Sequence, residues 1–220
     1  MLRKLRRARS KKGMRYFLIA LTVVLSVGLV GSFALMSMPS FQPEIGDNLQ
    51  GTNEGYYERL EKDIEEYKEI LEESPEELEI LEKLGNAQYD LGIGKLMEGD
   101  NVDRALDNIK EALDSYEKAL SIDPDNLELT IQTAVTAFYA GEKDRAETNY
   151  SKALKLDPES VEAKLSYGQF LLYGESDIAG AKKQWKEALA LAADDATKET
   201  LEAYIQQADQ MEKLQTEEDD

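Results

Sequence analysis

Two stretches of the chain share one pattern, and this repetition decides the fold. Residues 112–126 read ALDSYEKALSIDPDN and residues 146–160 read AETNYSKALKLDPES, so Ala, Tyr, Ala, Leu, Asp and Pro recur 34 residues apart. A fixed period of this length is typical of stacked repeats rather than of one closed domain, because each unit buries its apolar face only against its neighbours. The sequence therefore predicts a stack of similar helical units.

Small and aromatic residues hold regular places within one such unit. We count Leu127 as the first residue of a unit. Its characteristic residues are then Ala134 (position 8), Gly141 (15), Ala146 (20), Tyr150 (24), Ala153 (27) and Pro158 (32). Small side chains let two antiparallel helices approach, the aromatic side chain fills the gap between them, and proline ends the second helix. Asn126 and Ser160 precede the next first helices, where an N-cap is needed. The pattern resembles the tetratricopeptide repeat (TPR), over about residues 78–191.

Two further units follow the same pattern with departures. The unit that begins at Val161 matches, after one inserted residue, at Gly168, Ala181, Trp185 and Ala188. An earlier unit matches at Gly85, Ala112, Tyr116, Ala119 and Pro124. Gly85 and Ala112 are 27 residues apart, against 12 between Ala134 and Ala146, so 15 extra residues lengthen both helices or form a loop. The helical spacing of apolar residues across 91–109 favours longer helices.

Amphipathic segments flank the repeats. Before them, Tyr57, Leu60, Ile64, Tyr67 and Leu71 share one helical face, and Pro75 follows. After them, Leu201, Ile205 and Met211 supply a last helix, as a terminal repeat needs a cover for its core face. We expect residues 56–213 to form the repeat domain and residues 214–220 to be a solvated acidic tail.

The N-terminal region predicts a membrane anchor. Residues 1–16 hold eight of the 26 basic residues and no acid, and residues 17–38 form an uncharged, apolar run. This run is long enough to cross roughly 30 Å of hydrocarbon as one helix; a cleaved signal peptide, whose apolar core is usually shorter, is the alternative. The positive-inside rule places residues 1–16 in the cytoplasm and the repeat domain outside it, in a single-pass plasma (inner) membrane topology. Residues 39–55 are rich in Pro, Gly and Asn and are expected to be a linker.

Composition excludes several classes of function. All 45 acidic residues follow residue 43, which leaves 18 basic residues and a net charge of −27 beyond residue 16. Nucleic acid is an unsuitable partner for that surface. The chain has no Cys and no His, so it lacks the commonest metal ligand and the commonest general acid or base. We expect no catalytic residue, metal or cofactor, and no enzymatic activity.

The resemblance implies a binding groove. TPR proteins bind peptides or protein surfaces on the face built by the first helix of each pair. The residues that correspond to this groove are Glu128, Ile131, Gln132, Val135, Phe138, Tyr139, Leu165, Gln169, Leu172 and Tyr173. These positions lack the Lys, Asn and Arg with which chaperone-binding members hold a C-terminal carboxylate. Exposure of Ile131, Val135 and Phe138 together would create an apolar contact patch, unless neighbouring helices cover them.

These observations predict an all-α, TPR-type solenoid of about three helical hairpins with flanking helices, behind one N-terminal transmembrane helix. The expected function is a membrane-anchored scaffold that displays its groove outside the cytoplasm and assists the assembly of envelope or secreted proteins. Its partner is expected to be a protein or peptide with basic and apolar features. The alternative is a self-associating structural membrane module, in which Gly28 and Ser32 of the anchor contribute to a homo-oligomer.

Overall fold

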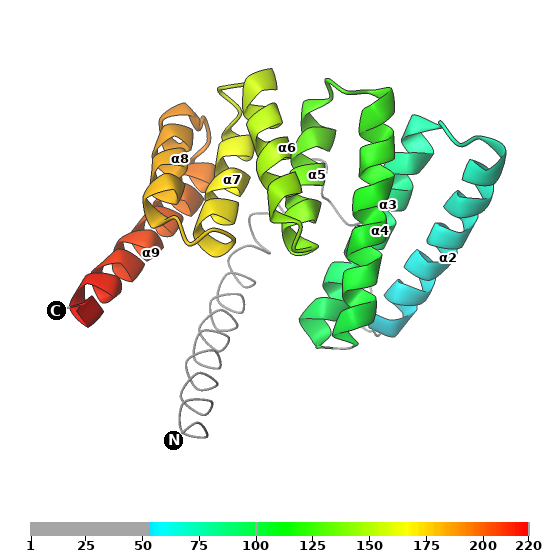
Figure 1. Cartoon of the computed structure of the whole chain (residues 1–220), viewed down its shortest axis with the longest axis horizontal. Coiled ribbons are helices and arrows are strands. Elements are labelled where there is room, and N and C mark those ends of the chain that lie inside the picture. Colours follow the sequence, from blue (N-terminus) through cyan, green and yellow to red (C-terminus); the bar gives the residue numbers. More distant parts are fainter. Residues whose placement is uncertain (1–52, 100, 220) are drawn as a thin grey trace, which may run out of the picture. The chain divides into compact units, whose positions relative to one another are not determined.

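The computed structural model describes residues 53–99 and 101–219, which fall within one compact unit (Figure 1). These residues form a TPR-like helical solenoid without a strand. The helices are α2 (Asn53–Glu73), α3 (Leu78–Glu98), α4 (Val102–Ile122), α5 (Leu127–Tyr139), α6 (Lys143–Leu156), α7 (Val161–Tyr173), α8 (Ile178–Leu191) and α9 (Asp195–Asp219). The predicted basic tail, the anchor at 17–38 and most of the linker lie outside the described residues. Among the helices that are described, none has the length and apolar character needed to span a membrane.

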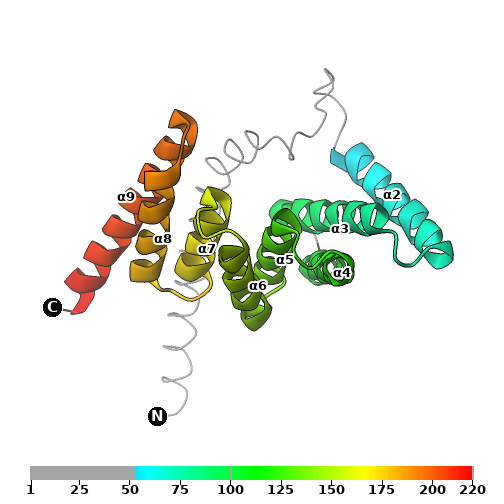
Figure 2. The same ribbon diagram turned by 90° about the horizontal axis from the view of Figure 1, so that it is seen from above.

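Each helix packs against the next one along the chain, as Figure 2 shows from above. Three hairpins result, α3/α4, α5/α6 and α7/α8, while α2 packs on α3 and α9 packs on α8. The first helices α5 and α7 also contact one another across the hairpins. The flanking helices thus cover the two ends of the stack, which a repeat array needs because its terminal units otherwise expose their core faces.

Small residues allow each hairpin to close. A side chain added at Gly85 would meet the ring of Tyr116 at 2.6 Å, and one added at Gly168 would meet the indole of Trp185 at 2.2 Å. In the middle hairpin, Ala134 is fully buried. In the first and third hairpins, the aromatic ring of the second helix therefore occupies space that only a small residue on the first helix leaves open.

The first hairpin is longer than the others because both of its helices are extended. Helices α3 and α4 have 21 residues each, whereas α5 and α7 have 13 and α6 and α8 have 14. The expectation of longer helices, rather than a loop, is confirmed. Close packing continues into the extension, because a Cβ atom at Gly92 would lie 2.9 Å from the carbonyl oxygen of Ala105. Helix α3 ends at Gly99, whose φ of 70° is a left-handed conformation that favours glycine.

Helix starts follow the predicted caps. The Asn126 side chain accepts a hydrogen bond from the amide of Leu129, and the Ser160 hydroxyl accepts one from the amide of Ala163. Both bonds satisfy amide groups that the first turn of a helix leaves without a partner. These short local bonds therefore set where α5 and α7 begin.

Threonines replace large apolar residues in the core of α5. Thr130, Thr133 and Thr136 are almost fully buried. Each hydroxyl donates to the carbonyl oxygen four residues earlier in the chain, at 2.6, 2.7 and 2.8 Å respectively. These local bonds satisfy the polar atom, so the remaining methyl group can pack as an apolar one.

The last helix is turned relative to the expected face. Leu201, Tyr204 and Ala208 are buried, whereas Ile205 and Met211 are only half-buried. Helix α9 also continues to Asp219, through the segment expected to be a tail. Packing against α8 therefore selects the side of α9 that carries Tyr204.

The register can be tested by adding volume at one buried alanine. We expect Ala153→Leu, at a fully buried position, to lower the free energy of unfolding by about 1–3 kcal/mol, because the extra methyl groups have no space. The matched change Ala203→Leu, at an exposed position in the middle of α9, should stay within about 0.5 kcal/mol. Denaturant unfolding of both variants measures the difference. Equal tolerance of the two changes would contradict the packing.

Candidate functional site

The candidate site is the surface that α3, α5 and α7 present to solvent, here called the first-helix face. Of the residues predicted to line it, Glu128 and Tyr139 are exposed, while Gln132, Val135, Phe138, Leu165, Gln169 and Tyr173 are half-buried. Ile131 and Leu172 are each only 3% exposed. Ile131 packs against Ala153 and Ala163 in the core between two hairpins. These two side chains therefore stabilise the stack and leave little surface for a partner.

Of the two alternatives left open for Ile131, Val135 and Phe138, the structure favours coverage by neighbouring helices over an exposed apolar patch. Ile131 is buried, and Val135 packs against the same core cluster. The ring of Phe138 meets that of buried Phe170 edge-on, at 5.7 Å between centroids. Neighbouring helices thus cover this side of α5, because α7 follows closely enough to accept its apolar side chains.

This part of the first-helix face exposes a tyrosine, Tyr139. Tyr139 is 45% exposed. Its ring centroid nevertheless lies 6.1 Å from that of Tyr89 in α3 and 5.2 Å from that of Phe138. Protein atoms surround part of this side chain, and this burial raises the pKa of the Tyr139 hydroxyl. Solvent still reaches the rest of the ring. An aromatic side chain in this setting can pack against an apolar group or a cation without first being ordered.

Helix α3 contributes three residues that the sequence analysis left out: Tyr89 and Asp90, described here, and Glu82, described below. Tyr89 and Asp90 follow Gly85 at the same distances as Phe138 and Tyr139 follow Ala134. The repeat register therefore held a signal for them, but the irregular spacing of the first unit hid it. Burial raises the pKa of the Asp90 carboxyl to about 6, and a hydrogen bond from the Tyr56 side chain of α2 opposes this shift.

Helix α9 completes the face at its other end. The Gln169 amide donates to the Tyr204 hydroxyl at 2.7 Å, and the Tyr204 ring stacks on Trp185 at 5.2 Å. Tyr204 was also missed, because amphipathic spacing alone does not reveal which side of a terminal helix meets its neighbour. Its role is to fix Gln169 beside Tyr173.

Carboxylates lie along the same face, one from each first helix. Burial and then the charge of Glu128 raise the pKa of Glu82, and the same two causes in the same order raise the pKa of Glu162. Glu82 comes from α3, Glu128 from α5 and Glu162 from α7. The structure gives none of the three an ion pair within the described residues. Their mutual repulsion is a source of free energy that a bound cation can relieve.

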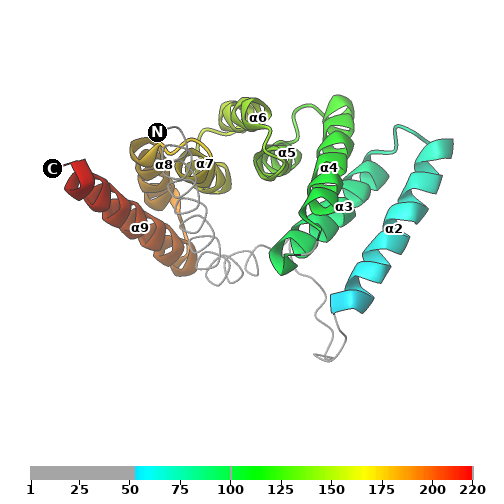
Figure 3. The same ribbon diagram turned by 60° about the horizontal axis from the view of Figure 1, so that its bottom comes forward.

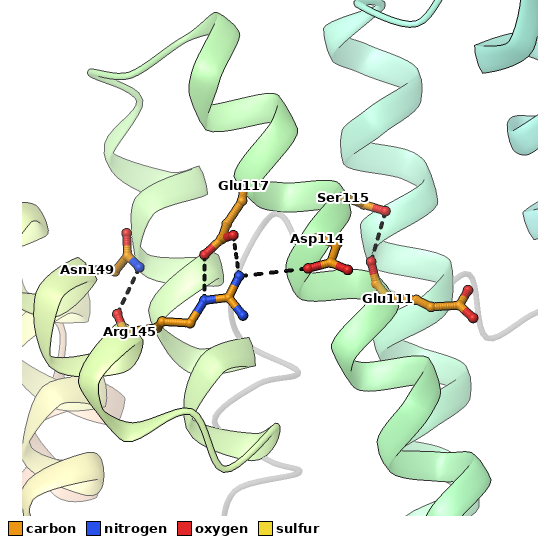
Figure 4. Close-up of polar contacts among 6 residues, drawn as sticks. All are labelled: Glu111, Asp114, Ser115, Glu117, Arg145 and Asn149. Atoms are coloured by element: carbon orange, nitrogen blue, oxygen red, sulfur yellow. Dashed lines mark hydrogen bonds and ion pairs between the residues drawn. The ribbon is translucent and has the colours of Figure 1, made fainter.

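Basic side chains are used on the other side of the hairpins. Figure 4 shows Arg145 of α6 donating from Nε to Glu117 of α4 at 2.9 Å, with Asp114 at 3.8 Å from Nη2. Lys164 turns away from the first-helix face to pair with Glu187 of α8 at 2.7 Å. Lys182 likewise pairs with Asp209 and Glu212 of α9. These pairs link α6 to α4, α7 to α8 and α8 to α9, and they occupy basic side chains that could otherwise neutralise the acids of the first-helix face.

The described residues contain no group of three or more acidic side chains placed to hold a metal ion. The face offers phenol, carboxylate and amide groups on rigid helices, without a nucleophile activated by a neighbouring base. This arrangement is suited to recognition of another molecule.

Comparison with known proteins gives the fold. No known protein family matches the sequence, and no curated protein matches it. Among solved structures, the crystal structure of MamA aligns with a TM-score of 0.52 at 16% identity, covering 79% of this chain and 99% of MamA. The Sgt2 TPR domain from Aspergillus fumigatus aligns at 0.42 and 20% identity, over 59% of this chain and 82% of that domain. The first TPR of Spaghetti (RPAP3), solved with the HSP90 peptide SRMEEVD, aligns at 0.39 and 21% identity, over 57% and 93%. At 16% identity, the likeness to MamA supports the TPR-like fold alone and leaves the function open.

Asp90 gives the stability a pH dependence with a definite sign. Because its pKa in the folded chain is raised from 3.8 to about 6, the folded state binds this proton more tightly than the unfolded state does. Its contribution to stability is therefore present at low pH and is lost as the pH rises from about 4 to about 6. We expect Asp90→Asn to raise the free energy of unfolding at pH 7 by about 1–3 kcal/mol relative to the original chain. At pH 4 the two proteins should differ little; an equal difference at both pH values would contradict this assignment.

Proposed function

We propose that this protein is a scaffold that binds a basic segment of another protein on its first-helix face. The observation that carries the proposal is that Glu82, Glu128 and Glu162 form no ion pair among the described residues and lie on the same face as the exposed Tyr139 of α5. A segment with Lys or Arg and an apolar residue suits both features at once. The carboxylates attract the cations, and the phenol ring packs on the apolar or guanidinium group.

The magnitude of each contact is modest, so several must act together. Exposed ion pairs typically contribute about 0.2–1 kcal/mol each, and an exposed cation–π contact contributes about 0.5–1 kcal/mol. Rigid helices hold these groups in place before binding, which lowers the entropy cost of recognition. The net charge of −27 beyond residue 16 also attracts a basic partner from a distance, and salt weakens this attraction.

The anchor and the topology complete the proposed role. An apolar run at 17–38 behind eight basic residues supports display of the helical domain outside the cytoplasm, at the inner membrane. There the scaffold would hold a basic segment of an envelope or secreted protein during assembly. The self-associating alternative is less well supported, because two acidic faces repel each other.

The binding proposal is tested by placing a photo-crosslinking phenylalanine analogue at position 139 of the full chain in intact cells. We expect crosslinks to a segment rich in Lys or Arg. The triple change Glu82→Gln, Glu128→Gln and Glu162→Gln should reduce the crosslink yield about tenfold, because it removes three attractive charges.

Two controls separate site from surface charge. The triple change Glu65→Gln, Glu66→Gln and Glu69→Gln neutralises exposed carboxylates of α2 and should leave the yield nearly unchanged. The same analogue at Ile122, which is 39% exposed at the end of α4, should not capture the same protein. Crosslinks to an acidic segment, or equal losses in both triple variants, would overturn the proposal.

Topology has its own test. Protease added to spheroplasts should digest residues beyond Gly55, because the positive-inside rule places them outside the cytoplasm. A cytoplasmic marker protein must stay intact in the same sample. Protection of the helical domain until lysis would contradict the proposed display.

A further inference from the structure

Helices α5 and α7 present the same order of side chains on the first-helix face. Helix α5 carries exposed Glu128 in its first turn and Tyr139 at its end, eleven residues later. Glu162 and Tyr173 hold the same places on α7. Residues four, seven and eleven positions after the acid lie within about 40° of it around the helix. Two straight lines of side chains result: Glu128, Gln132, Val135 and Tyr139 on α5, and Glu162, Ser166, Gln169 and Tyr173 on α7.

The acids and the tyrosines therefore form two rows across the stack. Each hairpin reverses the chain, so successive first helices run in the same direction, as Figure 1 shows for α5 and α7. The acids lie near the edge where these helices begin, and the tyrosines lie at the edge where they end. At 1.5 Å per residue, the two rows are roughly 16 Å apart on each helix. We call them the acidic row (Glu82, Glu128 and Glu162) and the tyrosine row (Tyr89, Tyr139 and Tyr173).

Helix α3 continues both rows. Burial and then the charge of Glu128 raise the pKa of Glu82, so these two carboxylates are neighbours. The rings of Tyr89 and Tyr139 are in contact, with their centroids 6.1 Å apart. On the other side, α5 contacts α7 directly. Figure 3 shows α5 and α7 between α9 and α2, so the rows cross the middle of the stack.

The spacing along the rows matches one kind of chain. Packed helices have axes about 8–10 Å apart, which sets the distance from one first helix to the next. An α-helix that lies along the rows brings a side chain to the same edge every seven residues, after about 10.5 Å. A β-strand rises about 3.3 Å per residue and alternates its sides, so residues on one side recur after about 7 or 13 Å. The helix keeps step with the rows, and the strand does not.

The width and the middle of the face favour the same answer. A helix with its side chains is about 10–12 Å across, and a long Lys or Arg side chain extends further at one edge, so a single helix reaches both rows. An extended segment also needs partners for its backbone N–H and C=O groups. Gln169, between the rows, already donates its amide to Tyr204 at 2.7 Å. A helix brings its backbone groups already bonded.

We propose that the segment bound on the first-helix face is an amphipathic α-helix that crosses α3, α5 and α7, with Lys or Arg along one edge and apolar side chains along the other. Its basic residues recur at positions i, i+7 and i+14 and face the acidic row. Residues at i+1 and i+5 are about 100° and 140° further around such a helix, and their apolar side chains face the tyrosine row. This inference rests on the proposed function, because it gives the basic segment a conformation and a sequence pattern.

Three synthetic peptides test this pattern. The heptad peptide has three heptads, with Arg at every seventh position, Leu one and five positions after each Arg, and Ala and Gln elsewhere. The permuted peptide has the same composition, but its Arg and Leu residues are spread around all sides of the helix. The proline peptide is the heptad peptide with Pro at its central position, which breaks the helix. Fluorescence anisotropy measures the binding of each peptide to the full chain in nonionic detergent, with protein-free micelles as the blank.

We expect the heptad peptide to bind about tenfold more tightly than the other two, because only this peptide presents three cations to the acidic row at once. Glu128→Gln with Glu162→Gln should reduce its affinity to that of the permuted peptide. The matched change Glu199→Gln with Glu202→Gln removes two charges from the exposed side of α9 and should leave the affinity nearly unchanged. All four side chains are exposed, so the melting temperature of both variants should equal that of the original chain.

The outcomes separate this inference from the proposed function. Equal or tighter binding of the permuted or the proline peptide would overturn the helical partner, while a basic segment would still be the ligand. Equal losses of affinity in the two charge variants would show attraction by overall charge and would overturn the match between rows and helix. Failure of the heptad peptide to bind would also overturn the inference, whereas crosslinking at position 139 tests the proposed function without any peptide.

Discussion

The close approach of the two helices in each hairpin is the constraint on which the rest of the structure depends. Gly85 and Gly168 leave space that the rings of Tyr116 and Trp185 fill, and Ala134 at the same position of the middle hairpin is fully buried. Once these positions are small, the second helix can lie only where its ring fits, because protein interiors tolerate neither voids nor overlap. Repetition of this contact gives the stack its order, and the first helices of successive hairpins come to form one continuous surface.

As a consequence, basic residues are used in ion pairs between helices, whereas acidic residues remain on the first-helix face. Basic residues of the second helices form ion pairs with acidic residues of neighbouring hairpins. Arg145 of α6, for example, pairs with Glu117 of α4. Even Lys164, which belongs to a first helix, reaches across to Glu187 of α8. Glu82, Glu128 and Glu162 form no such pair within the part of the chain that the structure describes, and burial together with the charge of Glu128 raises the pKa of Glu82 and Glu162. A surface of this kind suits the basic partner that we propose, because the repulsion among its carboxylates falls on binding.

The two ends of the stack have different roles. At the C-terminal end, α9 covers α8 and fixes Gln169 through Tyr204. At the N-terminal end, α2 covers α3 and holds the long hairpin through Tyr57 and Glu61. The extended hairpin requires its own close packing, which Gly92 permits against Ala105 and Ile109. The candidate site and the covered ends of the stack thus use different residues of the same helices.

The sequence by itself determined the helical repeat, its register and the starts of α5 and α7, because these depend on local properties: the 34-residue period, small residues opposite rings, and caps such as Asn126 and Ser160. It also predicted the longer first hairpin from helical spacing. Only the tertiary structure decided that Ile131 and Leu172 are buried, that Phe138 packs on Phe170, and that Tyr89, Asp90, Glu82 and Tyr204 belong to the candidate site. The physical reason is that helical spacing shows which side chains share a face, whereas exposure depends on how near the next helix comes. That distance is set by contacts between residues far apart in the sequence.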